Sequence, residues 1–252
     1  MYIFSPHSYA VSFFFSAPIE RKNMKEINSN SPSKKQKNTD IIKMMCGVGI
    51  FSALAFITTF ICKLIPNVAG FLSIDAKDAV IAIASFVYGP IVAPIISIIV
   101  AFIEFITISE TGIWGLIMNF ASSATFSVTA SLIYKYRKSF NGAIIGFAVA
   151  TATTTLVMVL LNPIIVPLYT GAPRKVVIDM LPTILLPFNF AKTLMNSSIA
   201  MLLYKPIINA MRSAKLISKS NHKTEFNKTS VLTLAIGGVS LLTALIILLI
   251  IW

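Results

Sequence analysis

The sequence predicts an all-α integral membrane protein, and three observations support this fold class. Of the 252 residues, 56% are hydrophobic and only 12% are charged, and the mean hydropathy of +0.82 is too high for an ordinary soluble domain. The apolar residues gather in runs of about 20, the length that an α-helix needs to cross a bilayer. Lysine and arginine fall between these runs, a pattern that orients a membrane protein and requires no nucleic-acid partner.

The first 40 residues are predicted to be a disordered basic leader. The apolar patch YAVSFFFSAPI is short for a span and ends in no clear cleavage site. The tract KEINSNSPSKKQKNTD that follows has too little hydrophobicity to form a core. Met24 offers an alternative start. We therefore place the beginning of the membrane domain at residue 41.

Five apolar segments are long enough to cross a bilayer. They cover residues 41–62, 113–134, 142–161, 182–204 and 230–252. The region 78–107 is harder to assign, because proline and glycine at Gly89-Pro90 and Pro94 disfavour one continuous helix.

The basic loops decide how often residues 78–107 cross the membrane. Three Lys or Arg residues lie at 135–138, and six lie at 205–228. The positive-inside rule places both loops, and the basic tract before residue 41, in the cytoplasm. An even number of crossings must then separate residue 41 from residue 135. The region therefore forms two helices that meet at Gly89-Pro90 on the inner side, and residues 213–229 form a basic cytoplasmic linker.

One span carries a polar stripe. Asn189, Lys192 and Asn196 are spaced i, i+3, i+7, so they share one helical face. A lysine in mid-membrane costs about 2.5–3.5 kcal/mol and normally faces a cavity or a partner. Pro187 loosens the turn before this stripe. We therefore expect the stripe to point into the bundle.

Other spans offer polar partners for this stripe, namely Glu104, Asn119 and Asn162. Glu104 either neutralises Lys192 or accepts hydrogen bonds from ligand hydroxyls. Pro163 and Pro167 are expected to end the helix that carries Asn162. The serines and threonines in the spans are more simply explained as joints between helices.

Two amides and an ammonium suit a neutral heterocycle with alternating carbonyl and N–H groups, held between aromatic side chains. Candidates for those side chains are Trp114, Tyr169, Phe188 and Phe190. An ion pathway would call for more embedded acids than Glu104. An intramembrane enzyme using Lys192 and Glu104 lacks a nucleophile constellation, so we predict no catalytic residue.

The sequence contains no motif for binding a metal ion or hydrolysing a nucleotide. Both histidines, His7 and His222, lie outside the spans, and the two cysteines, Cys46 and Cys62, belong to one span. We expect no metal site and no cofactor. The chain has no GxxxxGK[ST] phosphate loop, so it does not hydrolyse ATP itself.

Four segments resemble the substrate-binding S components of energy-coupling factor (ECF) transporters, and within them the riboflavin-specific members. These segments are SIDAKDAVIAIASFVYGPIVAPIISIIVAFIEF, WGLIMNFASS, LNPIIVPLY and LLPFNFAK. Asn189 and Lys192 match the Asn-x-x-Lys pattern of that family. The resemblance covers about residues 41–212 and implies a six-helix S-component bundle, to which 230–252 adds a C-terminal transmembrane helix that we expect to face lipid.

The resemblance also implies residue roles. Asn162, Asn189 and Lys192 would contact the flavin ring, with Glu104 and Asn119 as further candidates. Riboflavin would enter from outside the cell beneath the first outer loop. That loop contains Asp75 and Asp78, which would gate the entrance.

The same resemblance implies partners. S components engage a transmembrane coupling subunit that carries two cytoplasmic ATPases. Here Gly49 and Ala53 form a small-xxx-small pair that permits close helix approach, either to that subunit or within the chain. An S component for another vitamin or heterocyclic solute, and a stand-alone secondary carrier in the plasma membrane, remain alternatives.

Overall fold

The computed structural model describes residues 34–137, 140–214, 216 and 228–251. Its contacts divide into two compact units, Met1–Asp40 and Ile41–Trp252, and the packing below is that of the second unit. Residues 1–33 of the predicted leader lie outside the described residues. The last seven residues of the leader, 34–40, are helical rather than disordered and form the start of α1 (Lys34–Cys62). Most of the predicted linker, 215 and 217–227, also lies outside them.

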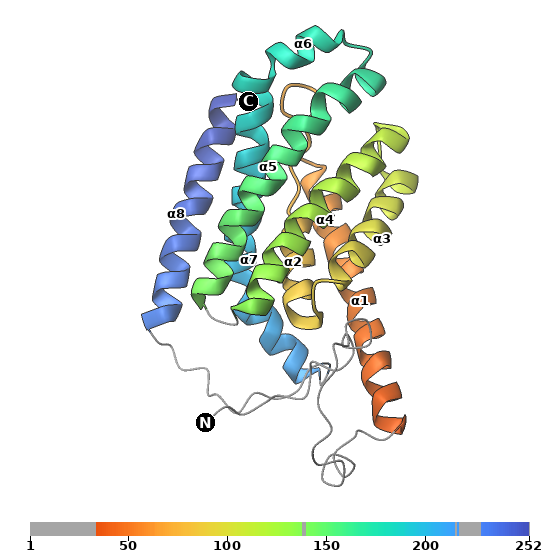
Figure 1. Ribbon diagram of the computed structural model, residues 1–252, viewed down its shortest axis with the longest axis vertical. Coiled ribbons are helices and arrows are strands. Elements are labelled where there is room, and N and C mark those ends of the chain that lie inside the picture. The colour runs from red at the N-terminus through yellow and green to blue at the C-terminus, as the bar shows by residue number, and fades with distance from the viewer. Residues whose placement is uncertain (1–33, 138–139, 215, 217–227, 252) are drawn as a thin grey trace, which may run out of the picture. The chain divides into compact units, whose positions relative to one another are not determined.

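The described residues form helices and contain no β-strand, which confirms the all-α fold class. Every predicted span corresponds to a helix (Figure 1). By length and composition, three helices in the described part of the chain are apolar enough to cross a membrane: Asn38–Cys62, Gly112–Tyr136 and Asn141–Thr170. The remaining helices are shorter or more polar. Besides α1, the helices are α2 (Lys77–Tyr88), α3 (Val92–Thr107), α4 (Gly112–Tyr136), α5 (Phe140–Thr170), α6 (Arg174–Asp179), α7 (Leu186–Ser213) and α8 (Lys228–Ile251), with a π-helical turn, η4 (Leu181–Leu185), before α7.

The predicted break between two short helices is confirmed at Gly89-Pro90. Gly89 has a φ of 101°, a conformation that glycine adopts without steric cost, and its N–H donates to the carbonyl of Ser85 at 2.9 Å. α2 therefore ends at Tyr88, and α3 begins at Val92.

The expectation that Pro163 and Pro167 end their helix is wrong. α5 continues through both prolines to Thr170 and ends before Gly171, whose φ is 71°. A proline removes one backbone hydrogen bond, but unwinding the chain in an apolar environment would leave several more carbonyls and N–H groups unpaired. The helix that carries Asn162 therefore remains helical on both sides of it.

α2 lies at the centre of the bundle. It contacts α3, α4 and α7, and every residue from Lys77 to Ser85 is buried. α7 in turn contacts α2, α5 and α8. Two charged side chains at the start of α2, Lys77 and Asp78, are thus enclosed by other helices, which requires compensation by polar partners.

The small-residue pair on α1 faces outward. Phe51 and Ala55 are buried on one side of α1, and the ring of Phe51 packs edge-on against Tyr88, with ring centroids 6.3 Å apart. Gly49 and Ala53 are exposed, and a Cβ on Gly49 would meet no atom within 4 Å. Among the described residues, packing of this pair within the chain, one of the two explanations offered by the sequence, is therefore not observed.

The expectation that residues 230–252 face only lipid is wrong for one side of α8. Gly237, Ala244 and Leu248 are buried, while Leu242 and Leu249 are exposed. α8 packs along α7, as Figure 1 shows. The buried positions are spaced i, i+7, i+11 and share a face.

Candidate substrate-binding site

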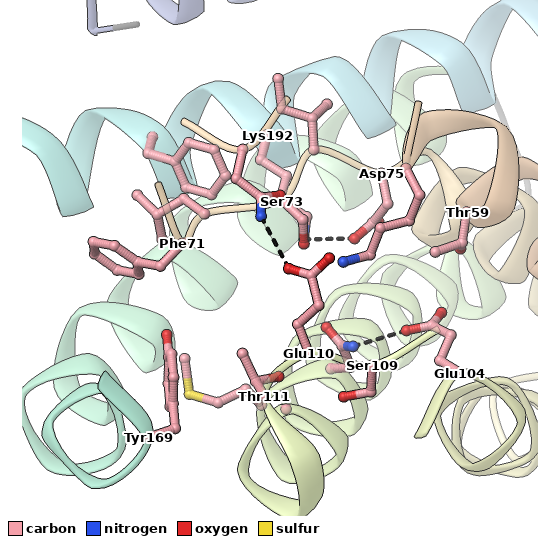
Figure 2. Close-up of a pocket in the computed structure, with 18 of the residues that line it drawn as sticks. Thr59, Phe71, Ser73, Asp75, Glu104, Ser109, Glu110, Thr111, Tyr169 and Lys192 are labelled. Carbon is pink, nitrogen blue, oxygen red and sulfur yellow. Dashed lines mark hydrogen bonds and ion pairs between the residues drawn. The ribbon is translucent and has the colours of Figure 1, made fainter. Parts of the chain in front are cut away.

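A cavity of about 310 Å³ lies at the end of the bundle opposite the Gly89-Pro90 turn (Figure 2). Its volume is at the lower end of the range of small-molecule sites, roughly 300–1,000 Å³. Residues 63–76 between α1 and α2, the connection between α3 and α4, and the adjoining ends of α4, α5 and α7 form its walls. This end of the bundle is called the cavity end below.

A tight turn shapes the segment between α1 and α2. Val68 and Leu72 exchange two backbone hydrogen bonds, of 2.8 and 3.0 Å. Ala69 and Gly70 between them have φ values of 51° and 81°. The closed turn presents the following residues, including Phe71, to the cavity.

Two buried ion pairs form part of the wall. The Nζ of Lys192 donates to Oδ2 of Asp75 at 2.7 Å. The Nζ of Lys77 donates to both carboxylate oxygens of Glu104 at 2.8 Å each, and it lies 3.7 Å from Oδ2 of Asp75, which links the two pairs. All four side chains are at most 10% exposed. Two ammonium groups balance two carboxylates, so this part of the wall carries no net charge.

The pairing of Glu104 with Lys192, which the sequence left open, is not observed. Glu104, which lines the cavity, instead accepts hydrogen bonds from Lys77 and from Nδ2 of Asn119 at 2.7 Å. Sequence analysis missed Lys77, because the run SIDAKDAV resembled an outer loop. A lysine at the start of an apolar helix between two aspartates is the signal that could have identified it.

The two predicted gate residues are both buried. Asp75 is 2% exposed and lines the cavity. Burial alone would raise its pKa, but the ammonium groups of Lys192 and Lys77 outweigh burial and hold the pKa of Asp75 below its ordinary value. Asp78 is 1% exposed, lies in the first turn of α2, accepts a hydrogen bond from Ser123 and does not line the cavity. Both side chains are therefore enclosed by the bundle rather than exposed at the entrance, and their gate role stays a prediction.

Three predicted amides, Asn119, Asn162 and Asn189, line the cavity, and the last two do so from α5 and α7. Asn162 and Asn189 are 1% and 4% exposed. Each donates its Nδ2 to a carbonyl of its own helix at 2.7 Å, Met158 for Asn162 and Leu185 for Asn189. The Oδ1 of Asn162 is buried and has no hydrogen-bond partner among the described residues. An acceptor left unpaired in this way costs about 1–3 kcal/mol, so it is suited to receive a donor from a ligand.

The third member of the polar stripe has a structural role. Asn196 is fully buried and does not line the cavity. Its Oδ1 accepts from the N–H of Ala79 at 2.9 Å, and its Nδ2 donates to the carbonyls of Asp75 at 2.9 Å and Lys192 at 3.0 Å. It therefore joins α7 to the start of α2.

Two of the four predicted aromatic side chains line the cavity. Phe188 and Tyr169 do so, together with Phe71. Trp114 and Phe190 do not, and Phe190 is 39% exposed. Over the described part of the chain, no cluster of three His, Cys, Asp or Glu residues could hold a metal ion.

Comparison with known families identifies the kind of protein that builds this cavity. A profile described as "ECF transporter, substrate-specific component" matches residues 43–207, more than half of the chain. The chain belongs to this family. Its members bind a substrate for transport and are not enzymes, and they work with the ECF module. The S-component fold and the membrane environment are thereby confirmed.

Two relatives of this S component are bacterial transporters. "Riboflavin transporter RibU" of Staphylococcus aureus (strain TCH60) is 28% identical over 188 residues, which cover 71% of this chain and 97% of the relative. "Riboflavin transporter FmnP" of Bacillus subtilis (strain 168) is 26% identical over 187 residues, which cover 69% and 98%.

A solved structure agrees with this assignment. It is described as "Structure and mechanism of the S component of a bacterial ECF transporter", and it matches with a TM-score of 0.57 and 29% identity over 70% of this chain and 99% of the other. α8 begins beyond residue 207, the last residue that the family profile matches.

Proposed function

We propose that this S component captures riboflavin from outside the cell and delivers it to the cytoplasm through the ATP-driven ECF module. The observation that carries the proposal is a cavity lined by Asn162, Asn189 and Lys192. Its buried ion pairs carry no net charge, and Oδ1 of Asn162 is an unpaired acceptor. The two riboflavin transporters to which the chain is similar support the same ligand.

The wall chemistry suits an uncharged ring with neighbouring donors and acceptors. Oδ1 of Asn162 can accept from a ring N–H, and Lys192 has hydrogens on Nζ beyond the one it gives to Asp75. Riboflavin carries such an N–H between two carbonyl groups and has no net charge. Its ring would pack against apolar surface from Phe188, Tyr169 and Phe71.

The charge pattern orients the protein. With the basic tracts on the cytoplasmic side, the N-terminus is inside and the cavity end faces the outside of a bacterial plasma membrane. Riboflavin is then cargo rather than a cofactor.

The exposed face of α1 is the surface that we assign to the transmembrane coupling subunit. Gly49 and Ala53 allow a partner helix to approach closely, and Ile50, Leu54 and Ile57 surround them as exposed apolar side chains. In our proposal, two cytoplasmic ATPases bound to that subunit supply the energy.

A binding experiment tests the ligand. The full chain is purified in detergent, its absorbance and fluorescence spectra are recorded, and protein stripped of ligand is titrated with riboflavin. We expect quenched flavin fluorescence that saturates at one flavin per chain. Leu156→Ala, on an exposed face of α5, serves as a control that keeps this affinity.

Two outcomes would contradict the proposal. A well-folded chain that ignores riboflavin but binds another vitamin or purine-like solute would retain the family and change the ligand. Riboflavin uptake into vesicles that contain the chain without the ECF module would identify a stand-alone carrier instead.

A further inference from the structure

The two faces of α7 have different surroundings. Asn189 and Lys192 point to the cavity. Ser198 follows Asn189 by nine residues, which places it about 180° away around the helix. Ser198 and Leu202 therefore lie on the back of α7, away from the cavity, and this back is where α8 packs.

The contact between α7 and α8 is close and directional. The hydroxyls of Ser198 and Ser240 are 2.7 Å apart, with either one able to donate to the other, and each also lies within hydrogen-bond distance of a carbonyl of its own helix. Next to this pair, a Cβ on Gly237 would lie 3.1 Å from Cδ2 and Cγ of Leu202 and 3.6 Å from the carbonyl oxygen of Ser198. The glycine thus allows the two helix backbones to approach.

The same contact extends to the cavity wall. Ala244 is fully buried and Leu248 is 3% exposed, and both belong to the hydrophobic cluster that contains Phe188, Ala191 and Leu72. Phe188 and Leu72 line the cavity. α8 and the ligand site are therefore connected through one apolar cluster as well as through α7.

The rotation of α7 is weakly determined by its own backbone. The wide turn of η4 precedes α7, Pro187 is its second residue, and Pro206 lies inside it. Wide turns and prolines both interrupt the regular hydrogen-bond ladder. A rotation of about 10° moves an atom about 8 Å from the helix axis by about 1.4 Å, which is enough to break a hydrogen bond.

We propose that α8 is a positioning helix for the substrate site, with Gly237 and Ser240 as its positioning residues. Asn196 holds one side of α7 against α2, and the contacts of Gly237 and Ser240 with Leu202 and Ser198 hold the other side. Together they set the rotation of α7 at which Asn189 and Lys192 face the ligand. α8 lies beyond the part of the chain that the family profile matches, so this support is an addition to the shared S-component core. The inference rests on the proposed riboflavin function, because riboflavin is the probe.

Two neighbouring glycines provide a matched test in the full chain. Gly237→Leu forces a side chain against Leu202, whereas a Cβ on Gly238 would meet no atom within 4 Å. We expect Gly237→Leu to weaken riboflavin binding about tenfold, mainly through faster dissociation, and to change the absorption band of the bound flavin. Gly238→Leu should keep the wild-type affinity and spectrum.

Rescue separates positioning from a general loss of stability. In Gly237→Leu, the new side chain pushes against Leu202, and Leu202→Ala removes that obstacle. The double variant Gly237→Leu/Leu202→Ala should therefore regain most of the affinity and the wild-type flavin spectrum. If Gly237→Leu does not fold, Gly237→Ala and Ser240→Ala provide milder variants, for which we expect about threefold weaker binding.

The outcomes distinguish this inference from the proposed function. The positioning role would be overturned if folded Gly237→Leu or Ser240→Ala protein bound riboflavin with the wild-type affinity and dissociation rate, even at a lower melting temperature. Riboflavin binding by the wild-type protein, and with it the proposed function, would be unaffected by that result. Wild-type protein that does not bind riboflavin would overturn the proposed function.

Discussion

Replacing Lys192 by methionine tests the centre of the proposed site. The change keeps an unbranched side chain but removes the ammonium that lies 2.7 Å from Oδ2 of Asp75. Asp75 is 2% exposed, so its carboxylate would remain buried, with Lys77 at 3.7 Å as its nearest described cation. The variant therefore perturbs both the fold and the ligand contact, and the two effects can be measured separately.

The expected magnitudes follow from these surroundings. Removing one partner of a buried pair typically costs about 3–5 kcal/mol of stability, and we expect the lower end because Lys77 remains close. Loss of the ammonium as a donor to the ligand should weaken binding by about 1–3 kcal/mol, or about 5- to 150-fold in Kd.

The assay combines riboflavin titration by fluorescence quenching with thermal unfolding of the same detergent sample. Asp75→Asn in the Lys192→Met background removes the stranded charge, so the melting temperature should recover while the affinity does not. Lys175→Met, at an exposed lysine on α6, controls for loss of positive charge. If Lys192→Met binds riboflavin as tightly as the wild type, Lys192 only supports the fold and its assignment to the site is wrong.

Four further predictions use the same preparation. Asn162→Ala should raise the Kd for riboflavin about tenfold by removing the unpaired acceptor, and an unchanged titration would show that the ligand does not reach it. Glu104→Gln should lower the melting temperature more than the affinity, because the carboxylate of Glu104 is paired with Lys77 and Asn119. A selective loss of affinity would mean that Glu104 contacts the ligand. Because the folded pKa of Asp75 is below its unfolded value, its ion pair contributes stability that is fully present above the unfolded pKa, about 4, and is lost as pH falls through the folded pKa. In Asp75→Asn protein this loss of melting temperature at low pH should be smaller than in the wild type, and a melting temperature that instead depends on Asp75 by rising as pH falls would show that the sign is wrong. Gly49→Leu should leave binding intact and abolish ATP-dependent uptake in vesicles with the ECF module, whereas normal uptake would exclude this face of α1.

The fold could be predicted because its signals are local. Hydrophobic length identifies a spanning helix within one segment, and the break at Gly89-Pro90 depends on two adjacent residues. The cavity-lining positions Asn162, Asn189 and Lys192 were accessible for a similar reason, since an amide or ammonium within a span requires an enclosed partner.

The pairings could not be predicted, because they join distant segments. Asp75 and Lys192 are 117 residues apart in sequence, and Lys77 and Glu104 are 27 apart. Four buried ionisable side chains allow more than one neutral pairing, and only the packing of α2 between its neighbours selects the observed one. The continuation of α5 through Pro163 could not be predicted from local sequence either. In an apolar environment, the cost of unpaired backbone groups outweighs the tendency of proline to end a helix.

These contacts indicate which wall of the site is fixed and which can move. Asn196 attaches one side of α7 to the backbone of α2, and Ser240 attaches the other side to α8. The mouth of the cavity is held more weakly. There, residues 63–76 contact the connection between α3 and α4 through an exposed hydrogen bond of 3.4 Å, which Nδ2 of Asn67 donates to Oε2 of Glu110. Figure 2 shows Glu110 extending into the pocket. Exposed hydrogen bonds with few buried neighbours open at low cost. We therefore expect ligand entry to displace the segment that contains Asn67 while α7 remains in place. The entrance would then lie beneath the first outer loop, where the family resemblance places it, and the gate role of the buried Asp75 and Asp78 stays a prediction.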